Sequence, residues 1–272
     1  MSPTDWLQQL RQRCVFSPAK KKIRGPVRTT RRQSIERLER RTLLSSAPIE
    51  VAAAIPASTG LFVENGQSLG SSETTDVQLG DLDSDGDLDA YVTNFQQGNK
   101  IWLNNGSGTF SDGGQSLGSS WSKGVGMGDL DGDGDLDAFV VNSVQANRVW
   151  LNNGSGVFSD SGQALGPSSG YGVSLADLDG DGDLDAFTAN RGEGNKVWLN
   201  NGSGVFSDSG QSLGSAESSG VNLGDLDGDG DLDAFVANNS TPYNGQPNKV
   251  WLNNGSGVFS SNGQSLVTFP RL

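Results

Sequence analysis

A repeat of 48 residues runs through most of this 272-residue chain and constrains its fold more than any other feature. The run Asp-Leu-Asp-x-Asp-Gly-Asp-Leu-Asp-Ala begins, at intervals of 48 residues, at Asp81, Asp129, Asp177 and Asp225. In each unit the run Trp-Leu-Asn-Asn-Gly-Ser-Gly follows, delayed by five residues in the fourth unit because of an insertion within Asn239–Pro247. Repeats of about 20–50 residues are typical of solenoids, propellers and arrays, in which one unit cannot bury its apolar face alone.

Within each unit the pattern predicts four short antiparallel strands, a to d. Asp137–Asn142 is rich in β-branched and aromatic residues and is bounded by turn residues. An Asn-Gly pair stands between the Trp-Leu run and the next Phe, which is typical of a tight hairpin. In the fourth unit the predicted strands are Gly220–Leu226, Leu232–Asn238, Asn248–Asn253 and Gly257–Leu266. We therefore expect an all-β, propeller-like array of four four-stranded blades.

One aromatic residue recurs in each of strands b, c and d. Their regular spacing predicts that these rings form the core between blades rather than a binding surface. They are Tyr91, Phe139, Phe187 and Phe235 in strand b, Trp102, Trp150, Trp198 and Trp251 in strand c, and Phe110, Phe158, Phe206 and Phe259 in strand d.

The Asp-rich run between strands a and b predicts a metal site in every unit. Five carboxylates in nine residues repel one another unless a cation lies among them. Oxygen ligands at alternating positions suit a hard cation with six to eight ligands, which is Ca²⁺. We number each loop from the first Asp of the run, so that Asp81 is position 1 and Asp89 is position 9. Positions 1, 3 and 5 supply carboxylates, and Gly at position 6 permits the turn. Position 7 offers its backbone carbonyl, and the carboxylate at position 9 completes the coordination shell. The predicted residues of the four calcium sites are Asp81, Asp83, Asp85, Asp87, Asp89, Asp129, Asp131, Asp133, Asp135, Asp137, Asp177, Asp179, Asp181, Asp183, Asp185, Asp225, Asp227, Asp229, Asp231 and Asp233.

The Asp-rich run followed by a hydrophobic strand resembles the FG-GAP/VCBS repeats, the calcium-binding blades of integrin α-subunit propellers and of bacterial surface proteins. The resemblance covers about residues 61–267. It implies Ca²⁺ at all four loops, each in the a–b hairpin on one rim of a propeller. Propellers of this family usually have seven blades, whereas this chain has four units.

Charge and composition exclude several classes of function. The net charge is −13, whereas a nucleic-acid-binding protein carries a basic surface. The chain has no His and one Cys, which excludes a His-activated nucleophile, a His-ligated metal and an intrachain disulfide. The sequence contains no run of about 18 apolar residues, so it predicts no membrane-spanning helix.

The N-terminal segment differs in charge from the rest of the chain. Residues 1–45 hold 12 of the 19 basic residues, which leaves 7 basic and 29 acidic residues, a net charge of −22, on the remainder. We expect a disordered or targeting segment, with a short helix around Ser34–Leu44. Leu38–Ser45 resembles the LEPR-XLL motif of exported bacterial surface proteins, although Arg40 replaces its proline. The predicted domains are residues 1–60, the repeat domain 61–267 and a tail 268–272, in an extracellular or cell-surface protein.

The non-repeating residues predict where a ligand binds. In a four-stranded meander the a–b and c–d turns lie at one face, and the b–c loops and d–a crossings lie at the other. The first set is nearly invariant between units, whereas the second differs in every unit. Recognition is usually built on loops carried by a rigid scaffold. The candidate ligand-binding residues are Phe95, Trp121, Lys123, Tyr171, Arg191, Glu193 and Tyr243.

The leading functional hypothesis is a non-catalytic, calcium-stabilised extracellular module that binds a protein or a glycan. The alternatives are a structural repeat fragment and the propeller domain of an extracellular polysaccharide lyase or hydrolase. No catalytic residue is predicted, because the clustered Asp residues suit calcium and the Glu residues beyond the N-terminal segment show no pairing.

The strand count predicts that the array does not close on itself. The run Gly-Gln-(Ser/Ala)-Leu occurs five times, at Gly66, Gly114, Gly162, Gly210 and Gly263. Leu61–Gly70 thus predicts a fifth d-type strand beside four sets of a, b and c strands. An open arc exposes strand edges, which natural sheets avoid. The count therefore favours a homodimer of four and four blades.

Overall fold

A computed structural model describes residues 63–239, 246–264 and 266. Over these residues the secondary structure consists of strands, and none of the described segments is helical. The predicted all-β fold is confirmed. The basic N-terminal segment, with its predicted helix and its export-like motif, lies outside the described residues, as does Tyr243. The boundaries of the three domains remain predictions. The described part of the chain offers no helix that could cross a membrane.

Repeat 1 (residues 74–112) forms an antiparallel sheet in sequence order. Its strands are β1 (Thr74–Gly80), β2 (Asp89–Asn94), β3 (Lys100–Asn104) and β4 (Phe110–Asp112). Repeat 4 (residues 218–261) repeats this arrangement with β12 (Ser218–Gly224), β13 (Asp233–Asn238), β14 (Lys249–Asn253) and β15 (Phe259–Ser261). Ala90 faces Trp102 in repeat 1 as Ala234 faces Trp251 in repeat 4, so the cross-strand register is the same in both.

Repeats 2 and 3 (residues 122–160 and 170–208) share one seven-stranded sheet. The strands of this sheet are β5 (Ser122–Gly128), β6 (Asp137–Asn152), β7 (Phe158–Asp160), β8 (Leu165–Ala176), β9 (Asp185–Asn190), β10 (Lys196–Asn200) and β11 (Phe206–Asp208). β6 spans the predicted strands b and c, and β8 extends strand a backwards into the d–a crossing. The two repeats join because Ser143 of β6 pairs with Ser169 of β8. Separate four-stranded sheets are therefore found only for the first and last repeats.

The d strands are shorter than the sequence pattern predicts. In repeat 4 strand d is Phe259–Ser261 instead of Gly257–Leu266, and strand a ends at Gly224 rather than Leu226. The described part of the predicted first d-type strand, residues 63–70, contains no strand at all. Positive φ angles at Gly66 and Gly70 (79° and 71°) bend the chain out of an extended strand there.

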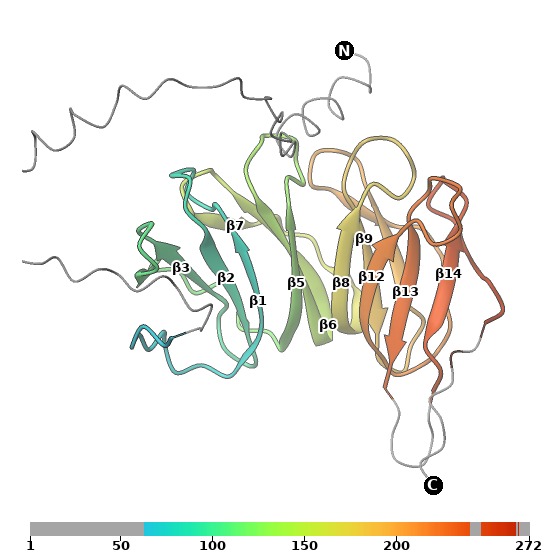
Figure 1. Cartoon of the computed structure of the whole chain (residues 1–272), viewed down its shortest axis with the longest axis horizontal. Helices are drawn as coiled ribbons and strands as arrows, with labels where there is room; N and C mark the ends of the chain where they lie inside the picture. Colours follow the sequence, from blue (N-terminus) through green and yellow to red (C-terminus); the bar gives the residue numbers. More distant parts are fainter. Residues whose placement is uncertain (1–62, 240–245, 265, 267–272) are drawn as a thin grey trace, which may run out of the picture. The chain divides into compact units, whose positions relative to one another are not determined.

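The sheets of neighbouring repeats lie face to face (Figure 1). A hydrophobic core fills each junction between neighbours. The first core joins Leu82, Tyr91 and Ile101 of repeat 1 to Ala138, Trp150 and Phe158 of repeat 2. The cores between repeats 2 and 3 and between repeats 3 and 4 use residues at equivalent positions. In each junction a strand b ring meets a strand d ring edge to face, as Tyr91 meets Phe158 at 5.3 Å between centroids. Most of the predicted core rings thus lie in a junction.

A short strap crosses each junction. The straps are the Gly-Gln-(Ser/Ala)-Leu segments, and the backbone of Leu117 in one of them pairs with Asn99 of repeat 1. The Leu117 side chain is buried between repeats 1 and 2. The Gln115 side chain accepts a hydrogen bond from Phe158 N (3.0 Å) and donates one to Phe158 O (3.0 Å). Each repeat therefore holds the next one by polar as well as apolar contacts.

Candidate metal loops and variable face

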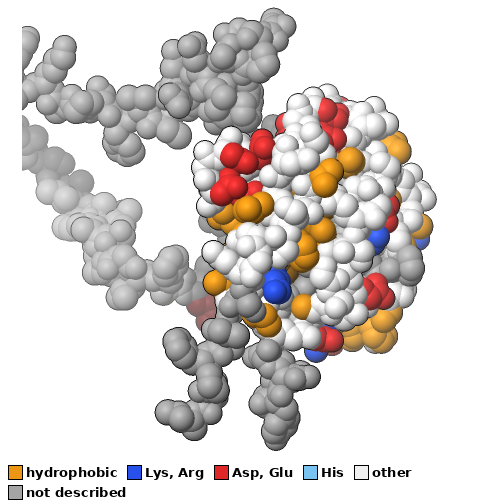
Figure 2. All heavy atoms as spheres, turned by 90° about the vertical axis from the view of Figure 1, so that its right-hand side faces the viewer, with side chains coloured by type: hydrophobic (Ala, Val, Ile, Leu, Met, Phe, Trp, Pro, Cys, Tyr) orange, Lys and Arg blue, Asp and Glu red, His pale blue; other side chains and the backbone are white. Residues whose placement is uncertain are grey.

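The Asp-rich loops bring carboxylates together at one end of each repeat. In every loop three Asp residues place oxygen atoms within 4.8 Å of one another. These groups are Asp81, Asp83 and Asp85; Asp129, Asp131 and Asp137; Asp177, Asp179 and Asp185; and Asp225, Asp227 and Asp229. Asp and Glu side chains gather along the upper edge of the face seen in Figure 2. Each predicted loop therefore supplies a set of oxygen donors.

The Asp at position 9 ties each loop to its sheet. Asp137 is fully buried, and its two oxygens accept hydrogen bonds from Leu130 N (2.9 Å) and Asn152 N (2.8 Å). Asp89, Asp185 and Asp233 make the same pair of bonds in the other repeats. At position 1, Asp129 accepts a bond from Gly134 N, whose φ of 96° only glycine adopts without strain. The loop is thereby folded around its own carboxylates.

Burial disfavours the charged form of several of these carboxyls. It raises the pKa of Asp137 and of Asp185 from 3.8 to about 6. Burial, followed by the charges of neighbouring Asp residues, also raises the pKa of Asp83, Asp131 and Asp179. A bound cation would remove this penalty, because it favours the ionised carboxylate.

Two carboxylate oxygens in the first loop provide a direct test of whether the loop fits a cation. Asp81 Oδ1 and Asp83 Oδ1 are buried and have no hydrogen-bond partner among the described residues. Buried polar atoms are normally paired, so two oxygens without a partner in the described part of the chain are available to a cation. A set of carboxylate oxygens without nitrogen or sulfur donors fits Ca²⁺.

The remaining Asp residues have other surroundings. The carboxylates at position 7 lie against the Asn-Gly turn of the same repeat, where a β-carbon on Gly106 would collide with Asp87. None of the position 7 side chains joins an oxygen cluster, as expected for residues that offer only a carbonyl. At position 5, all four Asp side chains accept a hydrogen bond from the backbone N–H of position 7, and Asp85 and Asp229 also join an oxygen cluster. The assignment of individual calcium ligands remains a prediction.

At the other end of the strands the variable segments form a continuous ladder. Backbone hydrogen bonds and β-bridges link each b–c loop to the crossing before it and, in repeats 1 to 3, also to the crossing after it. Ser143, for example, bonds to Trp121 O and pairs with Ser169. The ladder residues, in spatial order, are Glu73, Phe95, Trp121, Ser143, Ser169, Arg191, Glu217 and Asn239. The ladder therefore joins non-repeating residues from all four units on one connected surface.

Five of the predicted ligand-binding residues meet on this variable face. The Phe95 and Trp121 rings lie 4.9 Å apart between centroids, and Lys123 Nζ lies 4.3 Å from the Phe95 centroid. Tyr171 lies beyond Lys123, with 5.7 Å between Nζ and its ring centroid, and Arg191 stacks on the same ring at 5.3 Å. We call Phe95, Trp121, Lys123, Tyr171 and Arg191 the aromatic–cation cluster. Glu193 is exposed and makes none of these contacts.

Two features of this face were missed in the sequence. Lys123 and Tyr171 occupy β-bulges, since the register shifts between Ser122 and Gly124 and between Gly170 and Gly172. Bulges redirect a side chain and are common beside functional sites. Glu217 forms an ion pair with Arg191 across the ladder. The glycine that follows each bulged residue in the last three repeats was the available signal for the bulge.

Comparison with known proteins places the repeats in a family. The FG-GAP-like repeat matches residues 81–140, 129–188 and 177–236, together more than half of the chain. The chain belongs to the FG-GAP-like repeat family. The predicted family resemblance is thus confirmed.

Among solved structures, the V. cholerae biofilm matrix protein Bap1 is similar over 68% of this chain, at 20% identity and a TM-score of 0.41. The match covers 27% of Bap1, so this chain spans about a quarter of that protein. No curated protein matches the chain.

Proposed function

We propose that this FG-GAP-like array is a non-catalytic, calcium-stabilised binding module that acts outside the cell. It recognises a protein or a glycan through the variable face, opposite the Asp-rich loops. The observation that carries the proposal is the aromatic–cation cluster, which three different repeats build from residues outside the repeated pattern.

The four Asp-rich loops hold Ca²⁺ through the carboxylates at positions 1, 3, 5 and 9. Bound calcium neutralises charge that the folded loops otherwise keep at close range. The two unpaired oxygens of Asp81 and Asp83 support this role for the first loop. Calcium thereby fixes one end of every repeat and, through the strands, the spacing of the variable segments at the other end.

The aromatic–cation cluster favours an anionic or polar ligand with an apolar face. Among the described residues Lys123 forms no ion pair, whereas Arg191 is paired with Glu217. The half-buried rings of Phe95, Trp121 and Tyr171 can stack on a sugar ring or anchor a protein side chain, and an ammonium group can pair with a carboxylate or a sulfate. Of the two partner classes, an acidic glycan uses both parts of the cluster.

The test is a glycan array probed with the calcium-loaded protein, followed by titration of the best ligands by calorimetry. Replacing Trp121 and Tyr171 together by Ala should abolish binding and leave the melting temperature unchanged. Ser219→Ala is the matched control, because Ser219 occupies the bulge position of Lys123 and Tyr171 in repeat 4. A fall in melting temperature equal to that of a core substitution would assign the rings to the core instead.

The alternatives predict other outcomes of the same experiment. A lyase or hydrolase domain would release shorter sugars from a bound polysaccharide, which chromatography of the reaction mixture detects. A purely structural fragment would bind no glycan and no protein through the variable face. The extracellular location is supported by the calcium loops, since sites of moderate affinity fill at the millimolar calcium found outside cells.

A further inference from the structure

The two end repeats carry faces that the inner repeats bury. At each internal junction three residues of one repeat, which we call the knob residues, insert against the next repeat. They are Leu82, Tyr91 and Ile101 in repeat 1, Leu130, Phe139 and Val149 in repeat 2, and Leu178, Phe187 and Val197 in repeat 3. All nine side chains are at most 1% exposed.

Repeat 4 has Leu226, Phe235 and Val250 at the knob positions without a repeat to receive them, and the first two are exposed whereas Val250 is 7% exposed. Leu226 is 50% exposed and Phe235 is 37% exposed, whereas their equivalents Leu178 and Phe187 are 1% and 0% exposed. Figure 2 looks onto the end of the molecule that repeat 4 forms and shows hydrophobic side chains over it. A large apolar patch on a soluble protein marks an interaction surface.

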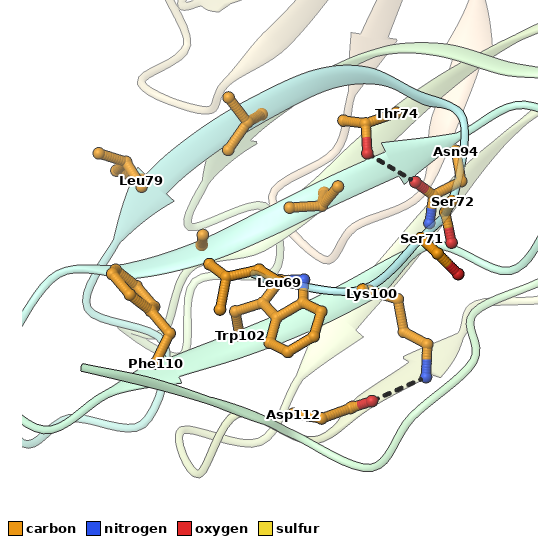
Figure 3. A pocket seen from close by; sticks show the side chains of 14 residues that line it. Leu69, Ser71, Ser72, Thr74, Leu79, Asn94, Lys100, Trp102, Phe110 and Asp112 are labelled. Atoms are coloured by element: carbon orange, nitrogen blue, oxygen red, sulfur yellow. Dashed lines mark hydrogen bonds and ion pairs between the residues drawn. The ribbon is translucent and has the colours of Figure 1, made fainter. Parts of the chain in front are cut away.

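Repeat 1 presents the receiving surface, a groove of about 490 Å³ (Figure 3). The groove is lined by Leu69, Val77, Leu79, Ala90, Val92, Trp102 and Phe110 among others. Each of these residues lies 48 positions before a residue that receives the knob of repeat 1, as Leu69 does before Leu117 and Trp102 before Trp150. The groove is therefore the equivalent of an internal junction from which the knob is missing.

Polar groups at the two ends match in the same way. Across each internal junction an Asn side chain donates a hydrogen bond to the knob Leu carbonyl, as Asn253 Nδ2 does to Leu178 O at 2.8 Å. The equivalent donor in repeat 1, Asn104 Nδ2, donates to Leu88 O of its own repeat and to no other described acceptor. The equivalent acceptor in repeat 4 is Leu226 O, which receives no such bond from the described residues. A junction formed between the two ends would therefore pair Asn104 Nδ2 with Leu226 O.

We propose that the knob residues of repeat 4 dock into the repeat 1 groove of a second copy of this chain. Both faces are exposed in one and the same chain, and no other described segment of that chain covers the groove. The interface is heterologous, because one copy contributes the knob and the other the groove. Two copies that exchange this contact twice form a ring of eight repeats with no face uncovered, within the four to eight blades usual for propellers.

An internal junction holds one strap, so a docked junction retains one of the two straps that its faces carry. The groove of repeat 1 already carries a strap, since Phe110 N donates to Gln67 Oε1 (2.8 Å) as Phe158 N donates to Gln115. Repeat 4 also carries a strap of its own, because Leu266 pairs with Asn248 as Leu117 pairs with Asn99. This second strap has to leave the junction when the knob residues of repeat 4 dock. The second strap, which contains Gln264, is then redundant, and Gln264→Ala should leave assembly unchanged.

The test is the mass of the full chain in millimolar calcium, measured by light scattering and sedimentation over a wide micromolar range of concentration. The wild-type protein should have twice the monomer mass. Phe235→Asp in the knob and Leu79→Asp in the groove should each yield monomers, because a buried unpaired carboxylate opposes docking. Mixing these two variants should restore a one-to-one complex, since one intact knob and one intact groove remain.

The matched control is Val205→Asp, at a side chain that is 52% exposed in repeat 3 and lies on neither end face. It should leave the dimer intact. A wild-type monomer would overturn the proposal, whether or not Phe235→Asp lowers its melting temperature. So would a dimer that Leu79→Asp does not affect. Assembly is measured without a ligand, so its failure leaves the proposed binding function untouched.

Discussion

Repeats 3 and 4 have nearly the same sequence in their Asp-rich loops and strands b, yet their surroundings differ. Phe187 in repeat 3 is fully buried under repeat 4, whereas Phe235 at the same position is 37% exposed. Asp177 and Asp179 in the repeat 3 loop are half-buried, whereas Asp225 and Asp227 at the same positions in repeat 4 are exposed. The comparison teaches that a unit's core is completed by its neighbour, because one face of each repeat becomes interior only when the next repeat covers it.

Removal of calcium should have the largest effect, and it should act on inner and outer loops together. For sites with Kd of about 10⁻⁴–10⁻³ M, calcium at 100 times Kd stabilises by about 2.7 kcal/mol per site, or roughly 10 kcal/mol for four sites. Thermal unfolding with and without a chelator measures this, and magnesium is the control ion. An unchanged melting temperature on chelation would contradict the calcium assignment.

The next largest effect should be the loss of stability caused by Phe187→Ala, compared with that of Phe235→Ala at the same position in repeat 4. Phe187 lies in the core between repeats 3 and 4, so truncating it should cost about 3–5 kcal/mol. In a monomeric background Phe235→Ala should cost less than about 1 kcal/mol, because less apolar surface is lost from the interior. Denaturant unfolding of the two variants in a Leu79→Asp background, with calcium present, gives both values. Equal losses would mean that the end face is covered in solution.

The pH dependence of the metal-free protein should follow the buried Asp residues of repeats 2 and 3. In the unfolded chain these carboxyls have a pKa near 3.8, and burial raises it to about 6 for Asp137 and Asp185. Between these values the folded state binds more protons, so its stability falls as the pH rises from about 4 to 6. The loss is on the order of 1–3 kcal/mol per residue. Melting curves in chelator should show this trend, and Asp185→Asn should reduce it. Saturating calcium should abolish the trend, and a metal-free protein that is more stable at pH 6 than at pH 4 would contradict it.

The smallest effect should come from the Asn residues that follow the strand c Trp-Leu pair. Asn253→Ala removes a buried hydrogen bond from Asn253 Nδ2 to Leu178 O and should cost about 1 kcal/mol. Asn104→Ala should cost less, because Asn104 makes no bond across a junction in the monomer. Chemical unfolding of monomeric variants measures the pair. A greater loss for Asn104→Ala would show that the repeat 1 end is not open.

The sequence predicted the elements that depend on local pattern and period. The Asp-rich loops, the Asn-Gly hairpins and the junction aromatics could be located because each recurs every 48 residues and has a direct chemical reason. The lengths of the d strands could not, since Phe259–Ser261 ends where the chain leaves the sheet to form a strap. The bulges at Lys123 and Tyr171 could not be predicted either, because their register is set by pairing with the next strand.

Residue identity alone therefore accounts for the fold class, the family and the position of the carboxylates. The tertiary structure was needed to find which surfaces meet. It joins repeats 2 and 3 through Ser143 and Ser169, gathers Phe95, Lys123 and Tyr171 from three repeats, and leaves Leu226 exposed where Leu178 is buried. The physical reason is that burial and pairing belong to contacts between units, and units of the same sequence differ in the neighbours that they have.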